Sequence, residues 1–449
     1  MSISKKELYF NFLFLMCYLG PGINIGSTHV RILELFFLTM FFINFRYIVK
    51  KKRTRNFGLF FLLFSGSMII SNLYGYAFLN IHPAYNDFML LFKVVIYVSC
   101  YSIGYKFILD DKLQKSWMIA TFIVLFIILC IAILEIKKSP IIGYILEHFY
   151  LSNEFYEDLV SRSRYMRPMA TFGNANSFTI VLLPLLATSL SYYFFKNKKG
   201  ILLFNLFIVA TLIILTMSRS GLICMLAIII ILFWFLRFRG KIYFLLCTAF
   251  LVVALFVTFQ SSVFFNTLVY RMKHGVGMIE SVGRKSGLQE RLDRWEAGYL
   301  KYKSSPILGW GSNKSSMSAG RHGFIPVNIG THSFPDSPDL ATFRKPHNQY
   351  IEVMMKMGIP GLILFWAFFF ILIEPSFQFK RRQKEKWLHV SLITLVSALA
   401  INALMVGFIF SNIIMLPILF IIGSLHRSID QYPSHFILGH SPKYHSIDK

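Results

Sequence analysis

A single histidine stands where a long polar stretch of the sequence meets an apolar one. His347 lies within residues 344–361, which read RKPHNQYIEVMMKMGIPG. Pro346 cannot continue a helix from before it, Asn348 is a favourable cap residue, and nothing after it breaks a helix before Gly358. We therefore expect a short helix that begins at His347.

On such a helix, positions i, i+3, i+4 and i+7 share one face, which here would hold His347, Tyr350, Ile351 and Met354. A neutral imidazole presented at a membrane surface could take a proton from a hydroxyl group within hydrogen-bond reach. A histidine at a helix start is more often a cap or a structural donor. The residue taken alone leaves both roles open.

Two arginines adjoin other apolar segments. Arg219 occurs in MSRSG, residues 217–221, between two apolar runs that leave almost no loop. An arginine so close to hydrocarbon is costly without a partner, so a functional role is the first hypothesis and snorkelling at a helix end is the alternative. Arg167 begins RPMATFGNAN, just before another apolar run. It either contacts a ligand or belongs to a capping turn with Asn176 at the helix start.

Residues 261–347 form the longest polar stretch and carry an excess of positive charge, with twelve Lys or Arg against six Asp or Glu. The planar fork of an arginine such as Arg291 suits bidentate binding of phosphate, while attraction to anionic headgroups or plain solvation is the alternative explanation. Four apolar or aromatic side chains recur in this stretch with helical spacing and predict an amphipathic helix on the membrane surface. They are Leu288, Leu292, Trp295 and Tyr299.

Composition indicates the class of protein. Of 449 residues, 55% are hydrophobic and 17% aromatic, and mean hydropathy is +0.58, far from the averages of a soluble domain. We expect an all-α integral membrane protein with about twelve transmembrane helices, placed by apolar windows of suitable length. The windows are 8–22, 31–49, 56–74, 86–106, 116–135, 176–195, 201–217, 219–236, 241–260, 357–375, 387–406 and 409–425.

Charge predicts the orientation of these helices. The net charge is +25, and every second short connection is basic, as in 46–55 and 380–386. With Lys5 and Lys6, these connections place both termini in the cytoplasm. The first helix is expected to stay uncleaved, because no small-residue cleavage site follows it. Much of the positive charge therefore reflects topology and not a nucleic-acid partner.

The expected organisation has four parts. Residues 1–260 hold helices one to nine with an outer loop at 136–175, residues 261–347 form one large extracytoplasmic loop with amphipathic helices, residues 348–425 hold the last three helices, and residues 426–449 form a cytoplasmic tail.

No metal or cofactor is expected. The five cysteines lie inside apolar runs, which argues against a disulfide framework or a thiol metal site. The outer acidic cluster of Glu154, Glu157 and Asp158 is better explained as a solvated loop than as a metal site. The first outer loop, residues 20–30, contains no Asp or Glu.

Taken in order, several segments resemble the O-antigen ligase / O-antigen polymerase family of bacterial surface-polysaccharide enzymes. The resemblance covers residues 165–375, and Lys356 departs from it because such proteins often have an acidic residue there. The matching residues are Arg167 with Thr171-Phe172-Gly173-Asn174-Ala175-Asn176, Ser218-Arg219-Ser220-Gly221, Arg291 with Trp295 and Pro306-Ile307-Leu308-Gly309-Trp310-Gly311, and His347-Asn348-Gln349-Tyr350 through Gly358-Ile359-Pro360-Gly361.

The resemblance implies metal-independent transfer of glycan from undecaprenyl diphosphate to an acceptor sugar hydroxyl. The transfer would take place on the periplasmic or outer face of the cytoplasmic (inner) membrane. The resemblance also implies that Arg219 and Arg291 hold the diphosphate and stabilise the leaving group, and that His347 accepts the proton of the attacking hydroxyl. Further expected substrate contacts are Arg167, Asn174, Asn176, Trp295, Asn348 and Tyr350.

Two activities share this chemistry. A polymerase joins repeat units of O-antigen or another surface polysaccharide, with a chain-length regulator as a possible partner, whereas a ligase moves finished glycan to the lipid A-core of lipopolysaccharide. The loop at 136–175 favours the polymerase as a second glycan-holding surface. A flippase or transporter is the alternative of another class, with Lys93, Asn205 and Asn402 as candidate polar residues inside the bundle. A membrane scaffold without enzymatic activity is a further alternative.

Overall fold

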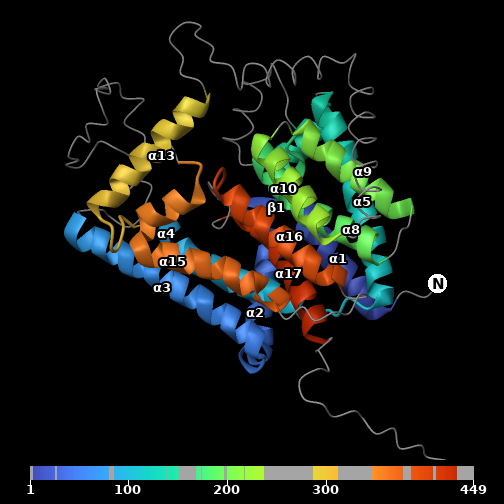
Figure 1. Ribbon diagram of the computed structural model, residues 1–449, viewed down its shortest axis with the longest axis horizontal. Helices are drawn as coiled ribbons and strands as arrows, with labels where there is room; N and C mark the ends of the chain where they lie inside the picture. The colour runs from blue at the N-terminus through green and yellow to red at the C-terminus, as the bar shows by residue number, and fades with distance from the viewer. Residues whose placement is uncertain are drawn as a thin grey trace, which may run out of the picture.

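The computed structural model describes residues 4–25, 28–79, 85–137, 139–150, 168–172, 174–196, 200–216, 218–236, 287–311, 346–377, 386–407 and 411–431. The described chain is a bundle of apolar helices, as Figure 1 shows. Its helices in the first half are α1 (Lys5–Leu19), α2 (Ile32–Lys50), α3 (Lys52–Leu79), α4 (Tyr85–Gly104), α5 (Asp111–Ile136), α6 (Pro140–Phe149), α8 (Ala175–Phe195), α9 (Gly200–Leu215) and α10 (Arg219–Phe235). The remaining elements are α13 (Gly287–Ser304), α15 (Gln349–Phe377), α16 (Lys386–Ala403), α17 (Asn412–Gln431) and the short 3-10 helix η1 (Ala170–Phe172).

Eleven of the expected apolar windows overlap these helices. The largest differences are at α15, which begins eight residues before its window, and at α17, which ends six residues after its window. The ninth window, 241–260, lies outside the described residues. Within the described chain, seven helices are long and apolar enough to cross a membrane, and the segments Phe92–Gly104, Gly200–Leu215 and Arg219–Phe235 are apolar but shorter. A multi-helix membrane protein is therefore confirmed, and the count of twelve stays a prediction.

One feature of the first outer loop differs from an all-α fold. Strands β1 (Gly22–Ile25) and β2 (Thr28–Arg31) pair antiparallel, with Gly22 opposite Arg31 and Ile25 opposite Thr28. The segment is too short for the sequence pattern to distinguish a hairpin from a loop. The hairpin carries Arg31 to the start of α2.

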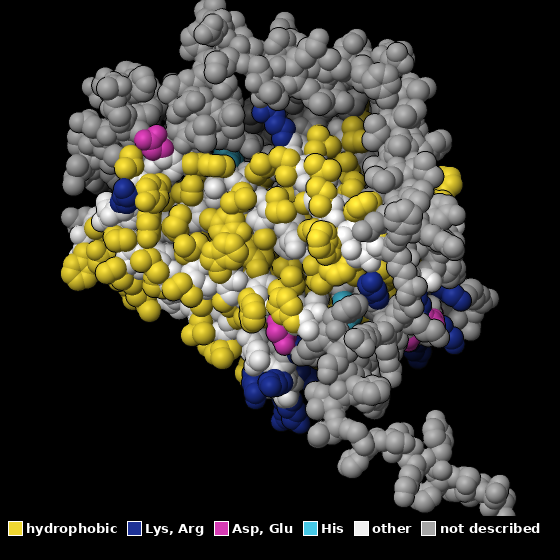
Figure 2. Space-filling model, in the orientation of Figure 1, with side chains coloured by type: hydrophobic (Ala, Val, Ile, Leu, Met, Phe, Trp, Pro, Cys, Tyr) yellow, Lys and Arg dark blue, Asp and Glu magenta, His cyan; other side chains and the backbone are white. Residues whose placement is uncertain are grey.

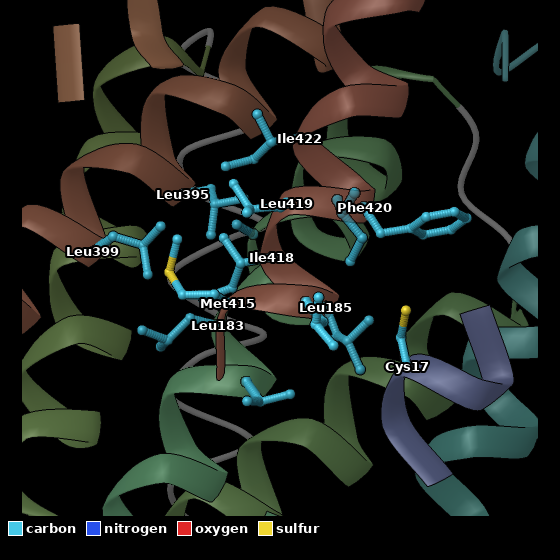
Figure 3. Packing of buried hydrophobic residues seen from close by; sticks show 14 of the residues in the cluster. Cys17, Leu183, Leu185, Leu395, Leu399, Met415, Ile418, Leu419, Phe420 and Ile422 are labelled. Atoms are coloured by element: carbon cyan, nitrogen blue, oxygen red, sulfur yellow. The ribbon is translucent and has the colours of Figure 1, made fainter. Parts of the chain in front are cut away.

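The core is formed by α8, α16 and α17, which lie against one another (Figure 3). Helix α8 is apolar on all sides and buried over most of its length, as expected for a helix surrounded by others. Leu183 of α8, Leu395 and Leu399 of α16, and Met415 of α17 meet there and are fully buried. The outer helices instead leave apolar side chains exposed, and Figure 2 shows them covering the face over α3 and α15.

The end of the bundle that is predicted to face the cytoplasm is joined by ion pairs. Arg53 of α3 donates to Asp430 of α17 at 2.8 and 3.0 Å and to Glu374 of α15 at 2.6 Å. Exposed Lys50, Lys51 and Lys52 lie nearby in sequence at the α2–α3 junction. Figure 2 shows dark blue Lys and Arg side chains gathered below the apolar face. This network fixes three helices at the end opposite to the one that begins α15.

Candidate functional site

His347 is exposed and lies immediately before α15, not in its first turn. Its backbone φ is +52°, a left-handed conformation that few residues other than glycine adopt. The helix begins at Gln349 because the Asn348 side chain caps it, accepting hydrogen bonds from the backbone N–H groups of Tyr350 and Ile351 at 3.0 and 3.3 Å. The expectation that His347 shares a helical face with Tyr350 is therefore wrong, because His347 is not helical.

Tyr350 is anchored on the neighbouring helix. Its hydroxyl donates to the carbonyl of Ala400 in α16 at 3.0 Å. A shallow surface depression of about 260 Å³ adjoins this contact. It is lined by Tyr350, Trp366, Ala400, Ile401 and Leu404, all but the Tyr350 hydroxyl apolar. The candidate base thus stands three residues from an apolar recess between α15 and α16.

Arg219 is the first residue of α10, and its side chain is exposed. Ser218 caps the helix by accepting from the Gly221 backbone N–H at 3.3 Å, and its hydroxyl donates to the Asn176 side chain at 2.9 Å. A β-carbon at Gly221 would lie only 2.0 Å from Thr179 of α8, so glycine is needed for α8 and α10 to approach. These contacts hold the Arg219 backbone against the start of α8.

Asn174, and not Asn176, caps α8. Its side-chain oxygen accepts from the Ser177 backbone N–H at 2.7 Å, and the helix begins at Ala175. Asn174 has an exposed side chain. Asn176 lies in the first turn and accepts the hydrogen bond from Ser218. From the sequence, Ser218 was recognised only as part of a matching motif and not as a cap, although serine followed by a helical run is the usual signal of a cap.

Arg219 and His347 lie at the same end of the bundle, on two sides of the last turns of α16. Cys224 of α10 contacts the carbonyl of Ala398 and the side chain of Asn402, each at 3.4 Å. Tyr350 contacts Ala400. Arg219 precedes Cys224 by five helical residues, which is about 8 Å along the helix axis at 1.5 Å per residue. His347 precedes Tyr350 by three residues, which span at most about 11 Å of chain.

Helix α13 crosses the beginning of α15 (Figure 1). A β-carbon at Gly298 would lie 2.5 Å from the Ile351 side chain and 2.9 Å from Met355, so the two helices touch there. Trp295, one turn earlier, is half-buried, and its indole N–H finds no hydrogen-bond partner within the described part of the chain. A helix is present where an amphipathic one was predicted, and it places Trp295 near the start of α15. Its location on the membrane surface stays a prediction.

The turn after α13 is inserted into a break in α15. Gly358 has φ +63° and ψ −154°, which interrupts the helix. The Trp310 and Gly311 N–H groups donate to the freed carbonyls of Met355 and Lys356 at 2.8 and 3.0 Å, and the Ile359 N–H donates to Pro306 at 2.9 Å. The breaker predicted at Gly358 is thus confirmed, and the segment Pro306 to Gly311 fills the gap it leaves.

Two lysines near this turn are buried. Lys356 pairs with Glu352 one turn earlier at 2.7 Å, so a basic residue at this position has its own acidic partner within α15. The Lys301 ammonium lies 5.1 Å from the centre of the Trp310 ring, and burial lowers the pKa of this amine to about 7. The Trp310 indole in turn donates to the Lys301 carbonyl at 2.8 Å.

Some predicted site residues lie outside the described structure. Arg167 and the acidic cluster at 154–158 fall in a range that is not described, and Arg291 is described only as part of the α13 backbone. Among the described residues, no three His, Cys, Asp or Glu side chains gather as metal ligands would.

The polar residues proposed for a transport path hold helices together. The Asn205 amide of α9 donates to the Met118 carbonyl of α5 at 3.2 Å, and the Asn402 amide donates to the Cys224 sulfur. Both asparagines are fully buried, whereas Lys93 in α4 is partly buried. The two amides therefore have structural contacts between neighbouring helices.

Comparison with known proteins bears on the same segments. The chain is 28% identical over 195 residues to an uncharacterized protein of Haemophilus influenzae, a match that covers 42% of this chain and 46% of that protein. The match thus spans less than half the length of this relative. Residues 204–366, which include Arg219, α13 and His347, match the family model described as O-antigen ligase. This segment of the chain is therefore similar to the O-antigen ligase family.

Proposed function

We propose that the protein transfers glycan from undecaprenyl diphosphate to the hydroxyl of an acceptor sugar. The observation that carries the proposal is the placement of Arg219 and His347 at one end of the bundle, inside the segment that matches the O-antigen ligase family. The match to this family supports a ligase- or polymerase-type function in general. The donor, the acceptor and the residue roles are our proposal.

In the proposed reaction the acceptor oxygen attacks the anomeric carbon of the donor sugar. The bond from that carbon to the diphosphate oxygen breaks, and undecaprenyl diphosphate leaves with the bonding electron pair. His347 takes the proton of the attacking hydroxyl. Arg219 and Arg291 bind the diphosphate and stabilise the negative charge that develops on it.

The exposed guanidinium of Arg219 suits this role because α10 begins at this residue. The N-terminal end of a helix carries unpaired N–H groups and a partial positive charge, both of which favour an anion. The left-handed backbone at His347 turns the chain just before α15 and leaves the imidazole exposed to a substrate. The half-buried Trp295 ring, near the start of α15, would contact sugar.

The other proposed substrate contacts differ in where they lie and in how far their side chains are already hydrogen-bonded. Asn174 and Asn176 lie beside Arg219, whereas Tyr350 lies at the apolar recess, where a lipid-linked donor could rest its chain. Asn348 already uses its side-chain oxygen in the cap of α15. Arg167 remains a proposal from the sequence.

The polymerase is the activity we favour, with ligation of finished glycan to lipid A-core as the alternative. The favouring argument is the outer loop proposed at 136–175, which would supply a second glycan-binding surface. We place the protein in the bacterial inner membrane with both termini in the cytoplasm and residues 261–347 on the periplasmic side. A chain-length regulator is a further proposed partner.

The lipopolysaccharide of a deletion strain tests the proposal and separates the two activities. Loss of polymerisation leaves a core that carries a single repeat unit, whereas loss of ligation leaves polymer on the lipid carrier and none on the core. An unchanged lipopolysaccharide and unchanged surface glycan would contradict both. Purified protein with lipid-linked repeat units should be active in EDTA, and loss of activity that magnesium restores would contradict the metal-independent mechanism.

A further inference from the structure

The segment that leads into α8 is held by two buried charged residues from distant parts of the chain. This segment, residues 168–172, contains Ala170 at φ +46°, a strained conformation for a residue with a β-carbon. The Thr171 hydroxyl donates to the carbonyl of Tyr18 at the end of α1 at 2.8 Å. Such a backbone persists only where its surroundings impose it.

Glu135 lies under one side of the segment. It is 4% exposed, and its carboxylate oxygens accept the backbone N–H of Met169 at 3.0 and 3.1 Å and that of Ala170 at 3.0 Å. A buried carboxylate is costly unless it is hydrogen-bonded, and hydrogen bonds to an ionised acceptor are the stronger ones. Glu135 therefore fixes the backbone N–H groups of two successive residues, Met169 and Ala170.

Arg31 lies on the other side. It ends β2, is 1% exposed, and donates from Nη2 to the carbonyl of Thr171. Its guanidinium carbon also lies 5.7 Å from the centre of the Phe172 ring. Its Nε finds no partner in the described part of the protein. The Glu34 carboxylate at the start of α2 interacts electrostatically with this guanidinium and offsets part of the cost of burying it. The directed hydrogen bond of Arg31 goes to the carbonyl of Thr171, so this side chain fixes the position of the turn.

The held segment is connected to the candidate site by short steps. Phe172 stacks on Phe178 of α8 with ring centres 5.5 Å apart. Two residues beyond Phe172, Asn174 caps α8, and Asn176 accepts the hydrogen bond of Ser218, the residue before Arg219. A shift of residues 168–172 would therefore move the start of α8 and, through Ser218, the Arg219 backbone.

We propose that Arg31 and Glu135 are positioning residues for glycan transfer, which clamp residues 168–172 and so set the place of Arg219 and Asn176 beside the donor diphosphate. The inference rests on the proposed function, since the clamp positions groups to which only that function gives a role. Neither residue touches the substrate. Both act through the backbone that they hold.

The test compares conservative variants at the clamp with a matched variant at the other end of the bundle. Glu135→Gln keeps the shape but places an amide NH₂ against backbone donors, and Arg31→Lys keeps the charge but loses the fork. The control is Arg53→Lys, which weakens a comparable network with Asp430 and Glu374. Each purified protein is assayed for thermal stability and for transfer from a lipid-linked repeat unit.

We expect a fall in kcat/KM of about 10- to 100-fold for each clamp variant, the scale that a displacement near 1 Å produces. The control should lose thermal stability with kcat/KM unchanged. The loss at the clamp should also disappear in an Arg219→Lys background, because residues that act through one another are not additive. Equal activity loss in control and clamp variants, or full additivity with Arg219→Lys, would overturn the proposal.

Two other outcomes have separate meanings: a clamp variant that does not accumulate, and a wild-type protein without transfer activity. If a clamp variant does not accumulate in the membrane, Thr171→Val removes only the hydroxyl anchor on Tyr18 and is assayed in the same way, with the same expected loss and the same overturning result. If the wild-type protein transfers no glycan at all, the proposed function fails, and the clamp as a positioning device for that function fails with it. Wild-type transfer with unaffected clamp variants overturns the clamp alone.

Discussion

The Ser218 hydroxyl donates a hydrogen bond of 2.9 Å to the side-chain oxygen of Asn176. This bond joins the residue before Arg219 to the first turn of α8, two elements more than 40 positions apart in the sequence. It also brings together two separate polar motifs, one ending in Asn176 and one beginning with Ser218. Both motifs hold helix starts at the same end of the bundle.

Replacing Ser218 by alanine should lower both stability and activity. The variant loses the cap of α10, which is worth about 1 kcal/mol, and frees the Arg219 backbone from α8. Thermal unfolding and the transfer assay measure the two effects. Ser4→Ala removes the cap of α1 and is the matched control, with a similar loss of stability and unchanged activity. Equal activity in both variants would show that the Ser218 contact is structural only.

Gly358→Ala should disrupt the contact between the turn at residues 306–311 and the break in α15. The residue has a positive φ, which costs a non-glycine residue about 1–3 kcal/mol, and the added carbon would lie 2.2 Å from the Ile307 carbonyl oxygen. We expect a lower melting temperature and faster proteolysis of α13. Gly66→Ala in α3 has open space around it and should be neutral or stabilising. A Gly358→Ala protein as stable as Gly66→Ala would contradict the packing of this turn into the break at Gly358.

The stability of the protein should rise with pH above about 7 through Lys301. Burial lowers the pKa of this amine to about 7, against 10.5 for an exposed lysine. Between these two values the unfolded chain binds more protons than the folded one, so the free energy of unfolding increases with pH across that window and is flat below it. The Trp310 ring favours the ammonium and opposes part of the effect.

Lys301→Met should remove this dependence and raise the melting temperature at neutral pH. Melting temperatures at pH 7 and pH 9 measure the change. Lys303→Met, at an exposed neighbour that contacts the Tyr299 ring, is the control and should keep the wild-type slope. Identical slopes in the wild type and in Lys301→Met would exclude Lys301 as the source.

The helices were predictable from the sequence because apolar windows of membrane length report directly on burial in lipid. Caps and breakers such as Asn348 and Gly358 were predictable too, since each acts within one turn. The left-handed His347 was not, because its conformation depends on what surrounds it. Nor was the clamp, because Arg31 and Glu135 stand more than 30 positions before the turn they hold, and one sequence does not reveal which distant groups meet.

The most direct test of the central claim is the transfer rate of His347→Asn in purified protein. Asparagine tolerates a positive φ, so this variant removes the imidazole without straining the turn. His389→Asn, in the first turn of α16 and so at the other end of that helix from the Tyr350 contact, is the control. With saturating lipid-linked donor, we expect kcat to fall roughly 100- to 10,000-fold in His347→Asn, the usual worth of a general base, with donor binding retained. A His347→Asn protein that transfers glycan at the wild-type rate would contradict the account.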